Sequence, residues 1–211
     1  TIVFTGAGGG GTNNLIADFH LSNLPAEEFR LIGTNLAPEI LVKSPLEENY
    51  ILPVATDPAY ADALKRLIEK CGVDLVIPNN DREVARISEL RNELDCTIFL
   101  PDDQAVKTAQ DKFLFYERLS AAGVPMARGE SLSSLYDIAP AMKEIGGDRW
   151  WVRPRTGSGS CGATWVQNAD QAKGWIQLWV EQRGFDVSQF TVSEFLPGRD
   201  YCFQSVWRDG D

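Results

Sequence analysis

The sequence predicts an α/β protein whose first half forms a parallel sheet and whose second half has a different, mixed α+β character. In the first half, strand-like apolar runs alternate with helical runs, and glycine or proline turns separate them. In the second half the composition changes, because all six tryptophans follow residue 149. The two ends of the chain therefore need different cores, and 211 residues suffice for one large domain or two small ones.

Composition excludes several classes of partner. The net charge is −10, with 30 acidic against 20 basic residues and no basic run, so neither nucleic acid nor a membrane surface is expected as a partner. No apolar run approaches the roughly 18 residues of a membrane span. The four cysteines form no CxxC pair, which argues for a reducing cytoplasm and against zinc or a disulfide framework.

Repeated strand–helix units organise the first half. Strands are predicted at residues 1–5, 29–33, 51–52, 73–77 and 97–100, and helices at 13–24, 58–71 and 81–90. Asp57 is the predicted N-cap of the second helix, and Asn80 with Glu83 has capping-box spacing for the third. Ligands of parallel sheets bind beyond the carboxyl ends of the strands, so the turns at residues 6–11 and 78–81 should lie near one another there.

The first glycine turn raises a dinucleotide-binding alternative. Residues 6–11 fit GxGxxG formally, between a strand and a helix. A dinucleotide site also needs an acid after the second strand to hold the ribose, and here that strand runs into Thr34 and Asn35. An NAD-binding oxidoreductase is therefore kept only as an alternative.

The second half reads as three helices and a set of strands. One helix opens at Asp111-Lys112 and stops at Gly123, and another is capped by Ser134. The third, capped by Asn168, carries two tryptophans one turn apart. Strands are predicted at residues 150–152, 163–167, 190–195 and 200–207.

Residues 150–166 carry the clearest chemical signal. A first strand delivers one cation, Arg153, to a loop rich in glycine and serine, and a second strand follows. Glycines let the backbone approach an anion closely, and hydroxyls and successive N–H groups can bind it. Arginine binds phosphate through two parallel hydrogen bonds. The hairpin predicts a phosphate-covering loop, with an ordinary surface hairpin as the alternative.

Four segments, in order, resemble the ATP-grasp superfamily. They are Asp111-Lys112 at a helix start, Leu119 to Gly123-Val-Pro125, Arg153-Pro154 with its glycine loop, and Ser193-Glu194-Phe-Leu-Pro-Gly198-x-Asp200-Tyr. Within the superfamily the chain looks most like lone-domain proteins similar to the large chain of carbamoyl phosphate synthetase. The resemblance implies a Rossmann-like preATP-grasp domain at residues 1–108. Residues 109–211 would be the first, incomplete part of an ATP-grasp fold.

The resemblance also assigns roles in binding ATP. Lys112 and Arg153 would be the two cations on the phosphates, with Arg153 acting as a catalytic residue that stabilises charge. Asp200 would accept hydrogen bonds from the ribose hydroxyls. The flexible loop would comprise Thr156, Gly157, Ser158, Gly159, Ser160 and Gly162, and the adenine hinge Glu194, Phe195 and Leu196. The substrate would meet Gly8, Gly9, Asn79 and Asp81.

In such an enzyme ATP would phosphorylate a carboxylate or bicarbonate, and an amine or ammonia would attack the acyl phosphate. The resemblance implies Mg²⁺ held by residues beyond Asp211, and no metal ligand within the chain. Asp209-Gly210 is a hairpin-turn signal without a second strand, so we expect a fragment that is inactive alone. A homodimer, or a second polypeptide that completes the fold, is left open, as is a non-catalytic ligand-binding module.

Overall fold

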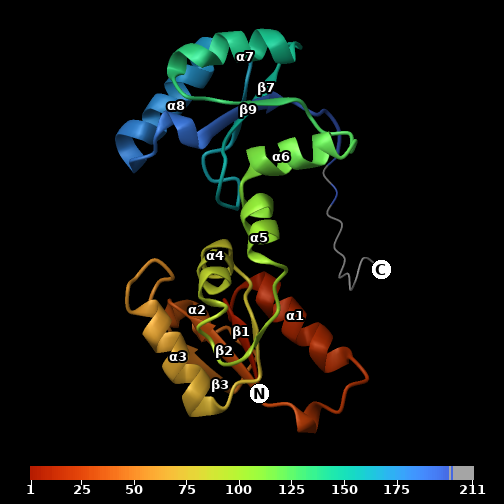
Figure 1. The fold of residues 1–211 in the computed structure, drawn as a ribbon, viewed down its shortest axis with the longest axis vertical. Coiled ribbons are helices and arrows are strands. Elements are labelled where there is room, and N and C mark those ends of the chain that lie inside the picture. Colours follow the sequence, from red (N-terminus) through yellow and green to blue (C-terminus); the bar gives the residue numbers. More distant parts are fainter. Residues whose placement is uncertain (200, 202–211) are drawn as a thin grey trace. The chain divides into compact units, whose positions relative to one another are not determined.

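The computed structural model describes residues 1–199 and 201, and it contains two compact units, Thr1–Asp111 and Lys112–Asp211 (Figure 1). The strand predicted at residues 200–207 and the Asp209-Gly210 turn lie outside the described residues. Within the described part, no helix has the length and apolar character that crossing a membrane requires.

The first unit is built on a five-stranded sheet in which every pair of neighbours is parallel, as predicted. The strand order is β3-β2-β1-β4-β5. The strands are β1 (Ile2–Thr5), β2 (Leu31–Asn35), β3 (Glu48–Ile51), β4 (Leu75–Ile77) and β5 (Thr97–Ile98). Between them lie α1 (Gly10–Leu21), a 3₁₀ turn η1 (Ala26–Glu28), α2 (Pro38–Leu41), α3 (Tyr60–Cys71) and α4 (Asp81–Leu90), and α5 (Asp103–Gln110) follows.

Successive residues of β1, the central strand, pack in two different hydrophobic cores. Val3 packs in a cluster with Leu64 of α3 and Ile87 of α4. Phe4 packs in a second cluster with Ile16 of α1. Because successive strand residues point to opposite faces, α1 covers one face of the sheet and α3 and α4 cover the other.

One predicted N-cap is wrong, and one predicted capping box is incomplete. The helix α3 begins at Tyr60 with Ala59 as its N-cap, and Asp57 instead accepts a hydrogen bond from the Ala59 N–H at 2.8 Å. Asn80 does cap α4, since its side chain accepts from the Glu83 N–H at 3.0 Å. The Glu83 carboxylate, however, accepts from the side-chain amide of Asn80 rather than from its backbone, so the predicted capping box is only half formed.

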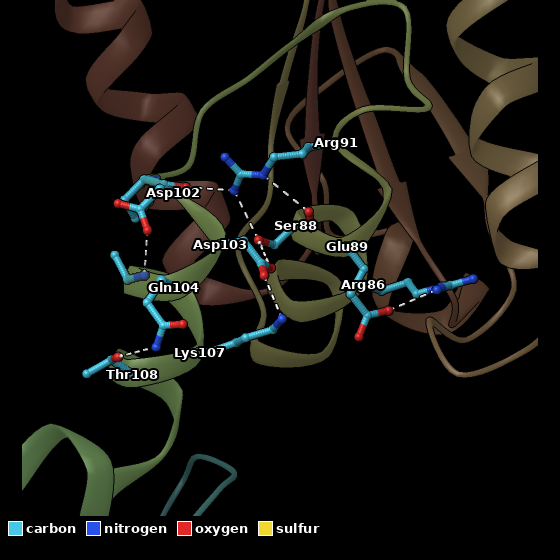
Figure 2. Close-up of polar contacts among 11 residues, drawn as sticks. Arg86, Ser88, Glu89, Arg91, Asp102, Asp103, Gln104, Lys107 and Thr108 are labelled. Atoms are coloured by element: carbon cyan, nitrogen blue, oxygen red, sulfur yellow. Dashed lines mark hydrogen bonds and ion pairs between the residues drawn. The ribbon is translucent and has the colours of Figure 1, made fainter.

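The helix α5 was not predicted from the sequence. It has eight residues and buries a single one, Val106, so the sequence offers only a short apolar signal for it. Polar contacts hold it against α4 instead, and the Ser88 hydroxyl donates to Asp103 at 2.9 Å (Figure 2). Arg91 also donates to the Pro101 carbonyl at 2.6 Å. The order of this helix therefore depends on contacts that are distant in sequence.

The second unit contains a four-stranded antiparallel sheet in the order β6-β9-β7-β8. The strands are β6 (Gly129–Ser131), β7 (Trp150–Pro154), β8 (Thr164–Val166) and β9 (Phe190–Glu194). The helices are α6 (Lys112–Ala121), α7 (Ile138–Ile145) and α8 (Ala169–Arg183), with 3₁₀ turns η2 (Leu135–Asp137) and η3 (Val187–Gln189). Val152 and Val192, which face each other across β7 and β9, pack in one core with Ile138 of α7 and Ile176 of α8.

The predicted caps of the second unit are confirmed. Ser134 forms a reciprocal capping box with Asp137 at the start of η2, which leads into α7. The Asn168 side chain accepts from the Gln171 N–H at 2.9 Å at the start of α8.

We expect Asn168→Ala to lower the free energy of unfolding of the second unit by about 1 kcal/mol, because an N-terminal N–H of α8 loses its acceptor. Denaturant unfolding followed by tryptophan emission measures this unit, since all six tryptophans belong to it. Asn168→Asp keeps the acceptor and should stay near the wild-type value. No loss in Asn168→Ala, or an equal loss in Asn168→Asp, would contradict the capping role of this side chain.

Candidate functional site

Lys112 is held against the end of β7 by its backbone and by its side chain. Its N–H donates to the Arg155 carbonyl at 2.8 Å. Its ammonium Nζ donates to the Gly157 carbonyl at 2.6 Å and to the Arg155 carbonyl at 3.3 Å. The first residue of α6 therefore brings a cation directly to the glycine loop.

Arg153 reaches the same place from β7. Because residues alternate along a strand, Val152 enters the core while Arg153 points to the opposite face of the sheet. The Arg153 Nε is buried and hydrogen bonds to no described residue, and burial lowers the pKa of this guanidinium. An arginine stays charged even so, and a desolvated guanidinium whose Nε has no acceptor is poised to bind an anion.

The loop between β7 and β8 has a left-handed backbone at several positions, with φ of +98° at Gly157, +64° at Gly159 and +56° at Ser160. Its last part is anchored. A Cβ at Gly162 would lie 2.8 Å from Pro154 Cγ, and the Gly162 carbonyl accepts from Trp175 Nε1 at 2.9 Å. Nothing lies within 4 Å of a Cβ built at Gly157 or Gly159. The loop is therefore anchored at Gly162, whereas the space around Gly157 and Gly159 is open.

These elements enclose a pocket of about 170 Å³, called here the phosphate-loop pocket. It brings together Lys112, Arg153 and most of the predicted loop, with Trp151 as a wall that sequence reasoning did not assign. Its lining comprises Lys112, Trp151, Arg153, Pro154, Thr156, Gly157, Ser158, Gly159, Ser160, Cys161 and Ala163. The alternation of residues along a strand could have predicted Trp151 as a pocket residue, because Trp151 lies two residues before Arg153 on the same face of β7.

The predicted adenine hinge follows β9 beside this wall. The Phe195 ring lies 6.5 Å from the Trp151 ring and 6.4 Å from the Trp165 ring, measured between centroids. Glu194 is engaged with Arg128, whose carbonyl accepts from the Glu194 N–H at 2.8 Å. Leu196 is 65% exposed. Asp200 lies outside the described residues.

In the first unit, the two predicted substrate turns do lie side by side. The Asn79 N–H donates to Thr5 Oγ1 at 3.1 Å, which joins the turn after β4 to the end of β1. The Gly8 N–H donates to Asn13 Oδ1 at 3.0 Å and the Gly9 N–H to the Gly6 carbonyl at 3.1 Å. The N–H groups of Gly8 and Gly9 therefore stabilise the glycine turn itself.

Two more observations bear on the predicted chemistry of this unit. The Asp81 carbonyl accepts from Gln110 Nε2 at 2.7 Å, which ties the start of α4 to α5. Asn35, at the position where a dinucleotide site needs a ribose-binding acid, donates from Nδ2 to the Ala7 carbonyl at 2.7 Å. Asn35 thus acts as a brace between β2 and the glycine turn.

No group of three or more His, Cys, Asp or Glu side chains that could hold a metal ion occurs among residues 1–199 and 201.

Comparison with solved structures identifies the fold. The N5-carboxyaminoimidazole ribonucleotide synthetase of Thermus thermophilus superposes with a TM-score of 0.66 at 18% identity, over 93% of this chain and 47% of that one. The chain has the fold of the N-terminal part of ATP-grasp proteins. No protein-family model matches the sequence, and a search of curated proteins finds no match.

Two biotin carboxylases share this ATP-grasp architecture. That of the Hydrogenobacter thermophilus 2-oxoglutarate carboxylase, a domain dimer in complex with MgADP, ADP and bicarbonate, has a TM-score of 0.67 at 16% identity over 92% of this chain and 44% of that one. The Campylobacter jejuni enzyme, in a β-γ-ATP complex, has a TM-score of 0.65 at 14% identity over 93% and 45%. The chain thus spans about half the length of the solved structures it matches.

Proposed function

We propose that this chain is the ATP-binding portion of an ATP-dependent carboxylate–amine ligase. The observation that carries the proposal is the phosphate-loop pocket, in which Lys112, Arg153 with its unsatisfied Nε, and the glycine loop surround one small cavity. The fold supports the same assignment, because the compared ligase structures include complexes with adenine nucleotides.

In the proposed reaction, a carboxylate or bicarbonate oxygen attacks the γ-phosphorus of ATP and ADP leaves. An amine or ammonia then attacks the acyl carbon and expels phosphate. Lys112 and Arg153 would bind the phosphates and stabilise the charge that moves between their oxygens. The loop would exclude water, which protects the acyl phosphate from hydrolysis. Bound Mg²⁺ would neutralise phosphate charge.

The likeness to carbamoyl phosphate synthetase is a finer proposal, supported by the sequence motifs alone. We likewise propose, from the sequence motifs, a boundary between two domains near residues 108–109. The adenine hinge at Glu194, Phe195 and Leu196 is supported by the contact of Phe195 with the pocket wall. We also propose that the substrate contacts Gly8, Gly9, Asn79 and Asp81, and that Asp200 binds the ribose. A homodimer, or a second polypeptide that completes the fold, is a further proposal.

Titration with MgATP, by calorimetry and by tryptophan emission, tests the nucleotide site. We expect saturable binding with a change in emission, because Trp151 lines the pocket. Arg153→Ala should weaken binding about tenfold or more, since a charge-assisted hydrogen bond contributes roughly 1.5–3 kcal/mol. Arg153→Lys should retain part of the affinity, because it keeps the charge and loses the bidentate geometry.

A charge-matched control is Arg183→Ala, at the exposed end of α8 and outside the pocket lining. It should bind MgATP as the wild type does. Titration with NADH separates the oxidoreductase alternative, and saturable binding of NADH in place of ATP would overturn the proposal. So would MgATP binding that Arg153→Ala and Lys112→Ala both leave unchanged.

A further inference from the structure

A second and larger cavity lies in the first unit, with a volume of about 590 Å³. One wall is the loop at residues 55–58, and the other is the face of α4 that carries Arg82, Ala85, Arg86 and Glu89. We call it the charged groove. Its first wall follows β3 and its second follows β4, so both begin beyond the carboxyl ends of parallel strands, where ligands of such sheets bind. Its volume is in the range of small-molecule sites.

The middle of the groove is apolar and its rim is charged. Ala55 is 4% exposed and Ala85 is half-buried, and their small side chains leave room above them. Arg86 is already engaged, since it forms an ion pair with Glu89 at 2.9 Å (Figure 2). The charges at the rim that matter for a ligand are therefore Arg82 and Asp57.

Arg82 and Asp57 have opposite charges on opposite walls. Among the ion pairs of residues 1–199 and 201, neither side chain takes part in one. Asp57 Oδ1 accepts from the Ala59 N–H, which fixes the carboxylate on its wall and leaves Oδ2 for another donor. The groove thus presents one cation and one anion at its rim, above an apolar floor.

This arrangement selects the chemical class of the ligand. A simple anion would be attracted by Arg82 and repelled by Asp57. A simple cation would be attracted by Asp57 and repelled by Arg82. A small molecule with both a carboxylate and an ammonium satisfies both walls at once.

We propose that the charged groove binds an α-amino acid, with its carboxylate on Arg82, its ammonium on Asp57 and its side chain over Ala55 and Ala85. The proposal is independent of the nucleotide site, because the groove and the phosphate-loop pocket belong to different units.

The test is calorimetric titration of the full chain with each proteinogenic L-amino acid at millimolar concentration. We expect at least one to bind saturably. The deaminated acid and the decarboxylated amine that correspond to the tightest binder should each bind about tenfold more weakly or worse, because each lacks one of the two charges. Absence of binding by every amino acid would overturn the proposal, and so would a deaminated acid that binds as tightly as its parent.

Two variants locate the binding. Asp57→Asn retains an Oδ1 acceptor for the Ala59 N–H, so the turn is preserved while the charge is removed. Arg82→Gln changes an exposed side chain. Each should weaken the amino acid about tenfold or more, whereas Arg183→Gln, in the other unit, should leave the affinity unchanged. Binding unaffected by both groove variants would place the ligand elsewhere and contradict the assignment.

Discussion

Gly8→Ala should destabilise the first unit by roughly 2–5 kcal/mol, since it combines a left-handed backbone penalty with overpacking. Gly8 has a φ of +86°, a conformation that residues with a Cβ rarely adopt. A Cβ built there would also lie 2.0 Å from the Ile40 carbonyl oxygen, which belongs to α2. Backbone cannot rotate away as a flexible side chain can, so the glycine turn or α2 must move.

Gly10→Ala is the matched control. Gly10 opens α1, its φ is not positive, and no atom lies within 4 Å of a Cβ built there. Alanine should be neutral or stabilising by up to about 1 kcal/mol, because it favours the helix. Denaturant unfolding monitored by far-ultraviolet circular dichroism compares the variants, and hydrogen exchange of residues 2–21 and 31–41 localises the loss. Similar stabilities for both variants would contradict the steric argument.

The parallel sheet was predictable because its signals are local. Each strand is a short apolar run and each helix has periodic apolar positions, and the alternation of the two predicts a parallel sheet. The contacts that decide details are distant in sequence. The requirement for Gly8 comes from Ile40, and the order of α5 comes in part from the contact between Ser88 and Asp103. No local pattern contains these partners.

The candidate site also has parts that were predictable from contiguous residues and parts that were not. Arg153 and its glycine loop were predictable because a strand, a cation and the loop are contiguous, whereas Lys112 was reached only through the family resemblance. The structure supplies its physical link, the hydrogen bonds of Lys112 to the carbonyls of Arg155 and Gly157. Trp151 was missed because tryptophan on a strand is usually core, and only the neighbouring loop makes it a pocket wall.

Glu83→Ala should cost on the order of 3 kcal/mol in the free energy of unfolding of the first unit, because buried donors lose their acceptor. The Glu83 side chain is buried, with 7% of the residue exposed. Its Oε1 accepts from the Tyr60 hydroxyl at 3.0 Å, and its Oε2 accepts from the Asn80 side chain. Thr5 hydrogen bonds to it as well, so one carboxylate joins the ends of β1 and β4 to α3.

Glu83 should also make stability depend on pH. Burial raises the pKa of this carboxyl, and the hydrogen bonds from Thr5, Tyr60 and Asn80 only partly oppose the shift. A raised pKa means that the folded state holds the proton more tightly than the unfolded state does. Stability from this group is therefore fully present below its ordinary pKa of 4.5 and declines as pH rises from there through the raised value.

Glu83→Gln isolates this effect, because glutamine has nearly the same shape and does not titrate. Other carboxyls contribute to the pH dependence of both proteins, so the informative quantity is the wild-type free energy of unfolding minus that of the variant. We expect this difference to be most favourable to the wild type at acidic pH and to fall steadily toward neutrality. Tyr60 should not contribute to the pH dependence of stability between acidic and neutral pH, since burial and the Glu83 carboxylate raise the pKa of its phenol above an already high value. A difference that rises with pH would mean that the three donors outweigh burial and that Glu83 is held as a carboxylate, while a flat difference would mean that the two balance.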